Sequence, residues 1–259
     1  NLGKFVPAAE SFHRSYAYFE ALKDYEYMLY AQQGIVVMFS MNGFYEKAIS
    51  ERNLSIEKYK NLGLIKHLTT SYYNQALDFK KMGDEKKQLE FLLKAYDSMI
   101  NLPENDKTSN TQIMLYSALL EYYSEMGDVE EAQRYLILIE ETYIASSKSP
   151  QNKSYYYGAK AHHAMATGRY RSALAYAEKK LENILLVNYE DDILSSYKLL
   201  HETHKANKNY EESLHYLTKY DSLRGATYNK TTANSLAYYQ TLYETERTTR
   251  ELMAKNTRI

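Results

Sequence analysis

The chain has 259 residues, 44% of them hydrophobic and 25% charged, which provides enough apolar side chains for a substantial core. Its formal net charge of −1 removes the electrostatic basis for direct nucleic-acid binding, because no basic excess exists to displace counterions from phosphates. The lack of cysteine excludes disulfides and thiol chemistry, and only three prolines and nine glycines leave few helix breakers. We therefore expect a mainly helical protein, in which tyrosine, with 29 residues, is unusually frequent.

No segment of the sequence is apolar enough to span a membrane. The longest apolar run, GIVVMF at residues 34–39, falls far below the roughly 20 residues that a spanning helix needs. The first residues lack the pattern of a signal peptide, and the chain begins with asparagine instead of methionine. We expect that an upstream part has been removed, and that any membrane attachment comes from a segment outside this sequence.

A turn residue recurs about every 40 residues, at Gly3, Gly43, Gly83, Gly127, Gly168 and Lys208. The residue five positions after the turn is small in five of the six copies, which read Ala8, Ala48, Gln88, Ala132, Ala173 and Ser213. Positions four, seven and eleven residues before a turn are mostly apolar or aromatic and share one face of a helix. Each repeat is therefore predicted to be two helices that are joined at a left-handed turn and cross closely at the small residue.

This pattern resembles the tetratricopeptide repeat (TPR). The segments YNQALDFKKMGDEKKQLEFLLKAY (73–96) and YYGAKAHHAMATGRYRSALAYAEKKL (156–181) carry the resemblance well, although the period exceeds the 34 residues common in that family. The resemblance implies an all-α, right-handed superhelical solenoid of antiparallel helix pairs over residues 1–225. Five full pairs and one partial first copy are predicted, followed by a capping or linker helix over residues 226–259.

The resemblance also implies a concave surface that binds a protein, a peptide or a small ligand. Positions ten, six and three residues before each turn avoid the packing face, so we expect them on this surface. Six of the candidate binding residues stand at these positions: Tyr73, Lys80, Glu121, His162, Lys198 and Glu202. Tyr155, thirteen residues before its turn, is the seventh candidate. The surface lacks the repeated lysine and asparagine clamp with which chaperone-binding members hold a C-terminal carboxylate, so that partner is disfavoured.

Enzyme chemistry finds little support in the sequence. There is no glycine-rich phosphate loop, nucleophile elbow, His-Glu-x-x-His motif or cysteine nucleophile, so we expect no catalytic residue and no cofactor. His201 and His204 fall on packing positions and lack the further ligands of a zinc site, so we expect no metal either. The acidic residues at 190–192 are expected at the start of a helix, where the helix dipole stabilises negative charge.

The last segment, residues 228–259, contains no glycine or proline and is predicted to form one long helix. Leu236, Tyr239 and Tyr243 share a face on which its first half could cap the last repeat. The segment LAYYQTLYETERTTREL (236–252) is similar to the one that closes the repeat region of bacterial TPR-containing two-component sensor kinases and LuxR-type transcriptional regulators. The similarity rests on Tyr243, Glu244, Thr245 and Glu246 directly after the last repeat.

That second resemblance implies a non-catalytic sensor module of a bacterial signalling protein, with a kinase or DNA-binding output domain outside this sequence. It implies a periplasmic position on a membrane-anchored sensor, with a cytoplasmic position as the alternative, and a homodimer through the C-terminal helix. One rival interpretation is a free-standing scaffold that assembles other proteins. Another is a complete cytoplasmic receptor for a peptide pheromone that itself inhibits a partner.

Overall fold

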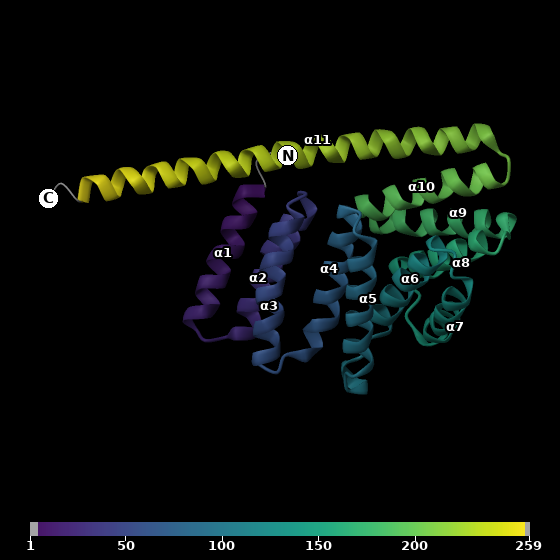
Figure 1. Ribbon diagram of the computed structural model, residues 1–259, viewed down its shortest axis with the longest axis horizontal. Helices are drawn as coiled ribbons and strands as arrows, with labels where there is room; N and C mark the ends of the chain where they lie inside the picture. The colour runs from purple at the N-terminus through teal and green to yellow at the C-terminus, as the bar shows by residue number, and fades with distance from the viewer. Residues whose placement is uncertain (1–4, 257–259) are drawn as a thin grey trace. The chain divides into compact units, whose positions relative to one another are not determined.

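The fold is all-α, as predicted, with helices in consecutive pairs and a long C-terminal helix (Figure 1). The computed structural model describes the backbone of residues 5–256, and the side chains of residues 7–239 except residue 9. The helices are α1 (Phe5–Ala21), α2 (Tyr25–Met41), α3 (Tyr45–Asn61), α4 (Leu68–Met82), α5 (Glu85–Ile100), α6 (Ser109–Glu125), α7 (Val129–Ala145), α8 (Pro150–Ala166), α9 (Tyr170–Val187), α10 (Glu190–Ala206) and α11 (Tyr210–Asn256). Two short 3₁₀ turns, η1 (Ile65–His67) and η2 (Glu104–Asp106), precede α4 and α6.

The predicted turns at Gly43, Gly83, Gly127, Gly168 and Lys208 each join two helices, whereas Gly3 lies outside the described residues. Gly43, Gly83, Gly127 and Gly168 have φ between 71° and 79°, and Lys208 takes the same left-handed conformation with φ of 63°. At the Gly-Asp turns the aspartate caps the next helix, since Asp84 accepts from the Lys87 amide at 3.0 Å and Asp128 from the Glu131 amide at 3.1 Å. The Met-Gly-Asp motif therefore both ends one helix and starts the next.

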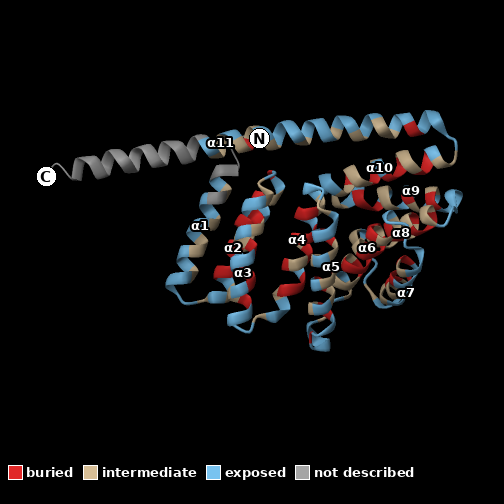
Figure 2. Cartoon of the chain, viewed as in Figure 1, coloured by how far each residue is buried: buried red, intermediate tan, exposed pale blue. Residues whose placement is uncertain are grey.

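The chain forms two compact units. The central unit contains residues 65–225, and the terminal unit contains residues 1–64 together with residues 226–259. Helix α11 begins in the central unit and continues into the terminal unit. In each unit the buried residues form stripes along helix faces, while the opposite faces are exposed (Figure 2).

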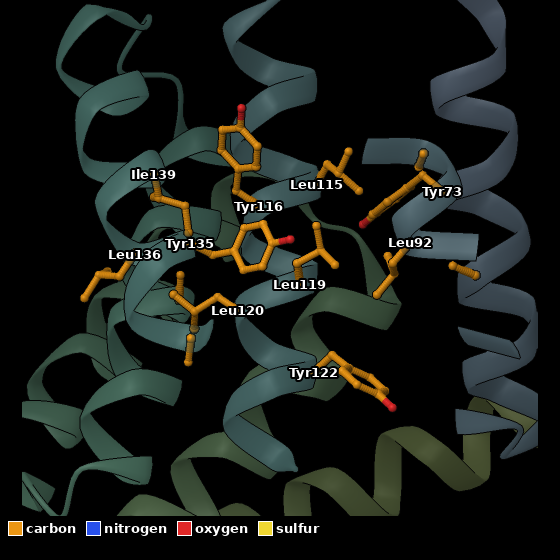
Figure 3. Close-up of a cluster of buried hydrophobic side chains, with 14 of the residues drawn as sticks. Tyr73, Leu92, Leu115, Tyr116, Leu119, Leu120, Tyr122, Tyr135, Leu136 and Ile139 are labelled. Carbon is orange, nitrogen blue, oxygen red and sulfur yellow. The ribbon is translucent and has the colours of Figure 1, made fainter. Parts of the chain in front are cut away.

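The core of the central unit lies between the paired helices and contains large side chains around small ones. Its largest cluster joins α4 to α8 and includes Leu92, Leu119, Leu120 and Ile139, all at most 1% exposed (Figure 3). Ala132 and Ala173, five residues after their turns, are fully buried. Small side chains at these positions allow the two helices of a pair to approach closely, as the sequence predicted.

An aromatic contact that recurs in the central unit uses seven of the 29 tyrosines. The residue eleven before each turn packs against the residue eight after it, with ring centroids 6.1–6.3 Å apart, in the pairs Tyr72–Phe91, Tyr116–Tyr135, Tyr157–Tyr176 and Tyr197–Tyr216. In three of these pairs a lysine three residues further on lies over one of the rings: Lys94, Lys179 and Lys219. Such aromatic pairs each contribute about 0.5–1.5 kcal/mol beyond their area burial.

The terminal unit replaces this aromatic pair with a polar one and adds part of α11 to its core. Gln32 and Glu51, at the equivalent positions, form a hydrogen bond of 3.4 Å between Nε2 and Oε2. Tyr238 of α11 packs edge-on against Phe39 and Phe44, with centroids 5.8 and 5.3 Å apart. The turn between α2 and α3 is therefore covered by residues near the chain's other end.

Tyr239, one of the residues predicted to cap the last repeat, packs against Phe44 in the terminal unit, with ring centroids 5.6 Å apart. Tyr243 and the Tyr-Glu-Thr-Glu sequence lie outside the side chains that the structure describes.

Candidate ligand-binding groove

The first helices of successive pairs bring three of the candidate residues together in the central unit. Lys80 of α4 donates from Nζ to Oε1 of Glu121 on α6 at 3.0 Å. Nε2 of His162, on α8, lies 3.6 Å from the same oxygen. Glu121 and His162 both stand six residues before their turns, so the repeat period itself aligns them across neighbouring helices.

A lysine from the second helix of a pair also reaches this cluster. Lys180 of α9 donates from Nζ to Ser195 Oγ of α10 at 3.0 Å, and its charge acts on Glu121, Asp192 and His162. Its aliphatic stem passes over Gly158, where an added Cβ would lie only 3.1 Å from Lys180 Cδ. Gly158 therefore provides the space through which Lys180 extends. We call Lys80, Glu121, Glu125, His162, Lys180 and Asp192 the charge cluster.

The charge cluster shifts the pKa values of its members. Burial alone would raise the pKa of Glu121, but the charges of Lys80, His162 and Lys180 outweigh it and hold that pKa well below its usual range. Burial lowers the pKa of His162 to about 4, and the nearby lysines add to this effect against the attraction of Glu121. Burial also lowers the pKa of Lys180. At neutral pH the imidazole of His162 is therefore uncharged beside an ionised Glu121.

The remaining candidate residues lie around the cluster in different environments. Tyr73 is only 8% exposed and belongs to the hydrophobic cluster of Figure 3, so its ring offers little surface to a ligand. Tyr155 is half-buried, and its hydroxyl accepts a hydrogen bond from Gln151 at 3.2 Å. Burial is the main cause that raises the pKa of Tyr155 to about 12, and the charge of Asp192 adds to it. Lys198 and Glu202 form an exposed ion pair of 3.8 Å on α10.

A pocket of about 250 Å³ opens beside the charge cluster between α6, α8 and α10. Apolar atoms come from Met165, Ala166 and Leu199, and polar ones from Ser124, Glu125, His162 and Glu202. Desolvation, followed by the like charges of Glu121 and Glu202, raises the pKa of Glu125 despite the nearby lysines. The pocket therefore combines an apolar wall with carboxylates from two helices.

Two solved structures share this arrangement of helices. BtubC (BKLC) from P. vanneervenii is 15% identical over 86% of this chain and 91% of its own, with a TM-score of 0.59. The nearly identical TPR-like repeats of a Podosopora anserina protein assigned as a kinesin light chain are 16% identical, over 77% of this chain and 95% of their own, with a TM-score of 0.50. The fold is TPR-like. No protein-family model and no curated protein sequence matches the chain.

The ligand atoms of Glu121, Glu125 and His162 lie within 4.8 Å of one another, which is close enough for three of them to reach one metal ion. The ammonium group of Lys80 already occupies the Glu121 carboxylate, and the charge of Lys180 adds to the repulsion of a cation. The positive charges around this triad therefore disfavour a cation there.

The two histidines that the sequence analysis weighed as metal ligands have structural contacts instead. His201 Nδ1 lies 2.9 Å from Ser213 Oγ, and the ring of His204 stacks on Tyr216 with centroids 5.4 Å apart. Both contacts join α10 to α11, the last pair of the TPR-like repeats. Within the part of the chain that the structure describes, no helix has the length and apolarity to cross a membrane.

Sequence reasoning missed Lys180 and Glu125 as members of the groove. Glu125 is the last residue of α6 and stands outside the three offsets used to predict the concave face. Lys180 belongs to a second helix, on which no groove residues were sought. The signal that could have found it is Gly158, because a glycine inside a helix lowers stability by about 1 kcal/mol and therefore calls for a packing reason.

Proposed function

We propose that this TPR-like domain is a non-catalytic module that binds a peptide or a segment of a partner protein along the first helices α4, α6, α8 and α10. The observation that carries the proposal is the joining of Lys80, Glu121 and His162 from three successive repeats beside an open pocket. These side chains come from three stacked helices, and both Lys80 and His162 lie against Glu121 beside one pocket. A charged strip that crosses several repeats next to a pocket suits an extended chain better than a compact substrate.

The exposed ion pair of Lys198 and Glu202 gives a direct test, because it can be changed without disturbing the core. A random peptide library displayed on phage is selected against the purified protein, and the selected peptides are synthesised. Their affinity is then measured by fluorescence anisotropy for the protein and for the Glu202→Lys variant. We expect the variant to weaken binding about tenfold or more, because a reversed charge at the groove repels what the original attracted.

The matched control is Glu182→Lys on α9. Glu182 is exposed, and it lies two residues after Lys180, so the 100° turn per residue places it on the opposite side of that helix. This control should leave peptide affinity unchanged. Peptides that bind all three proteins equally, or a library that yields no binder, would contradict the proposed function.

We further propose that the module acts as the sensor part of a signalling protein, in which α11 transmits ligand binding. The 47-residue length of α11, which runs from the last repeat into the terminal unit, supports this role. Its contacts with His201 and His204 also couple the helix to α10, which carries Lys198 and Glu202. A ligand that binds one arrangement of α10 and α11 more tightly would shift the equilibrium between arrangements.

Hydrogen exchange distinguishes the sensor from the alternative of a plain scaffold. A selected peptide should change the exchange of α11 amides in residues 210–239 as well as those of the groove helices. If the peptide protects only α6, α8 and α10, the scaffold interpretation is favoured and the sensor proposal fails. The comparison is made between the protein without peptide and the protein at saturating peptide.

A further inference from the structure

The pocket between α6, α8 and α10 contains one carboxylate whose charge is not balanced by an ion pair. Lys80 is paired with Glu121, and Lys198 lies 3.8 Å from Glu202. Among the residues that the structure describes, no ion pair of 4.0 Å or less joins Glu125 to a cation. The carboxyl group of Glu125 lines the pocket together with Glu202, and its own ligand atom lies within 4.8 Å of those of Glu121 and His162.

The lining of the pocket also contains apolar side chains. These are Met165 and Ala166 of α8 and the largely buried Leu199 of α10. The imidazole of His162, also in the lining, is uncharged at neutral pH and adds no positive charge. An entering group would therefore meet both aliphatic atoms and carboxylates.

The volume of about 250 Å³ lies slightly below the roughly 300–1,000 Å³ of sites for drug-sized molecules. It suits one long side chain of a bound peptide. Lysine and arginine have the matching shape, because their aliphatic stems pack on apolar surface while the charged head stays at a polar one. Arginine fits the two carboxylates better, because its planar guanidinium can donate to two acceptors at once.

We propose that this pocket recognises an arginine side chain of the bound peptide, with the stem on Met165 and Leu199 and the guanidinium between Glu125 and Glu202. The proposal rests on the proposed function, since it names the residue that the groove selects. A guanidinium would give the exposed Glu125 carboxylate an ion pair closer than those that Lys80 and Lys198 provide, and it would lie next to a second carboxylate on α10. Lysine would enter the same pocket but could donate to the two carboxylates only as a point charge.

The test uses a small probe that does not depend on any peptide sequence. N-acetyl-arginine N-methylamide is titrated into protein labelled with ¹³C at its methionine methyl groups, and the nine methionines give separate signals to follow. The Met165 signal is assigned from its loss in the Met165→Leu variant. N-acetyl-citrulline N-methylamide serves as the neutral probe of nearly the same shape.

We expect the arginine probe to shift the Met165 signal in a saturable way and the citrulline probe to leave it in place. Glu125→Gln should weaken the arginine probe about tenfold, the usual effect of losing one hydrogen bond to a charged group. The matched control, Glu182→Gln on the far side of α9, should bind like the unchanged protein. Equal shifts from both probes, no shift from either, or unchanged affinity in Glu125→Gln would each overturn the proposal.

The display experiment separates this inference from the proposed function. If selected peptides depend on Glu202 but contain no arginine that matters for affinity, the peptide-binding function stands and the arginine pocket is rejected. If no peptide depends on the groove, the proposed function itself fails. Both proposals are supported if a selected peptide contains an arginine whose replacement by citrulline weakens binding, and if Glu125→Gln weakens binding of the original peptide to the same degree.

Discussion

The side-chain amide of Asn234 donates to the side-chain oxygen of Asn42 at 2.6 Å, although 192 positions separate the two residues. Both side chains are about 9% exposed. The same turn accepts a second bond, from Ser235 Oγ to the Asn42 carbonyl at 3.2 Å, and Asn42 in turn donates to Met38 at 2.7 Å. The C-terminal end of α2 is therefore held by residues of α11 within the terminal unit.

Replacing Asn234 by alanine should loosen this contact. The substitution leaves the buried side-chain oxygen of Asn42 without the donor of this hydrogen bond. A buried polar atom that loses its partner lowers the free energy of unfolding by about 1–3 kcal/mol. We expect the backbone amides of residues 226–239 to exchange with deuterium about tenfold faster or more, measured by mass spectrometry. Asn229→Ala, an exposed asparagine on the same helix, is the control and should exchange at the original rate. Equal exchange in both variants would show that the bond does not hold α11.

Tyr135 should be the most important single aromatic residue for stability. It is 1% exposed, stacks on Tyr123 at 5.8 Å, and also contacts Tyr96 and Tyr116. Tyr135→Ala should reduce the free energy of unfolding by about 3–5 kcal/mol, as other large aromatic deletions do. Urea unfolding followed by far-UV circular dichroism measures this change.

Two further substitutions make the Tyr135 result specific. Tyr135→Phe keeps the ring and its stacking, so it should lose much less stability than the alanine variant. Tyr210→Ala removes a tyrosine that is 66% exposed at the start of α11, and its effect should stay within about 0.5 kcal/mol. A Tyr210→Ala effect as large as that of Tyr135→Ala would contradict the packing role assigned to the aromatic pairs.

The repeat period predicted the fold well because it encodes local requirements. A left-handed turn favours glycine, and a close helix crossing favours a small residue, so Gly127 and Ala132 can be found in the sequence without a structure. The same period aligned Glu121 with His162, since equivalent positions of stacked repeats become neighbours. These contacts follow from one short pattern that is repeated along the chain.

Other contacts could not be predicted because no local pattern specifies them. The aromatic pair joins residues eleven before and eight after a turn, and the second of these positions was not among the offsets considered. The bond between Asn42 and Asn234 depends on the direction of a long helix, which the hydrophobic pattern does not define. Lys180 reaches the charge cluster past Gly158 on a neighbouring helix, where an added Cβ would lie 3.1 Å from Lys180 Cδ.

Lys208 offers a route to higher stability. It occupies the turn position that is glycine in the preceding copies, and its φ of 63° is a conformation that disfavours residues with a Cβ atom by roughly 1–2 kcal/mol. Lys208→Gly should raise the free energy of unfolding by up to about 1 kcal/mol, because relief of this strain exceeds the added freedom of the unfolded chain. Thermal and urea unfolding measure the change.

Lys208→Ala is the control for Lys208→Gly, because it removes the charge but keeps the Cβ atom. It should bring no comparable gain in stability. The reverse experiment, Gly127→Ala, should destabilise the protein by about 1 kcal/mol. No atom lies within 4 Å of the added Cβ, so the backbone conformation alone would be the cause. A stabilising Lys208→Ala would indicate that the charge, not the turn geometry, is unfavourable there.

His162 should make stability depend on pH between neutrality and pH 5. Its pKa in the folded chain is about 4, below the ordinary 6.5, so the unfolded chain binds more protons in this window. Stability is therefore highest above pH 6.5 and falls as the pH decreases toward the folded pKa. At 1.36 kcal/mol per pKa unit, the His162 contribution between pH 7 and pH 5 is a loss of about 2 kcal/mol. Urea unfolding at several pH values measures it.

The contribution of His162 is isolated by subtraction. His162→Gln keeps a polar side chain but does not titrate, so its stability should fall by about 2 kcal/mol less than that of the original protein over the same range. Some dependence should remain, because burial and Arg169 also lower the pKa of His163. The stability that depends on ionised Glu121 is lost only at lower pH, because the pKa of that carboxyl is held below its usual value of 4.5. If the free energy of unfolding depended on pH identically in the original protein and in His162→Gln, the imidazole would not be desolvated beside Glu121. The electrostatic description of the groove would then be wrong.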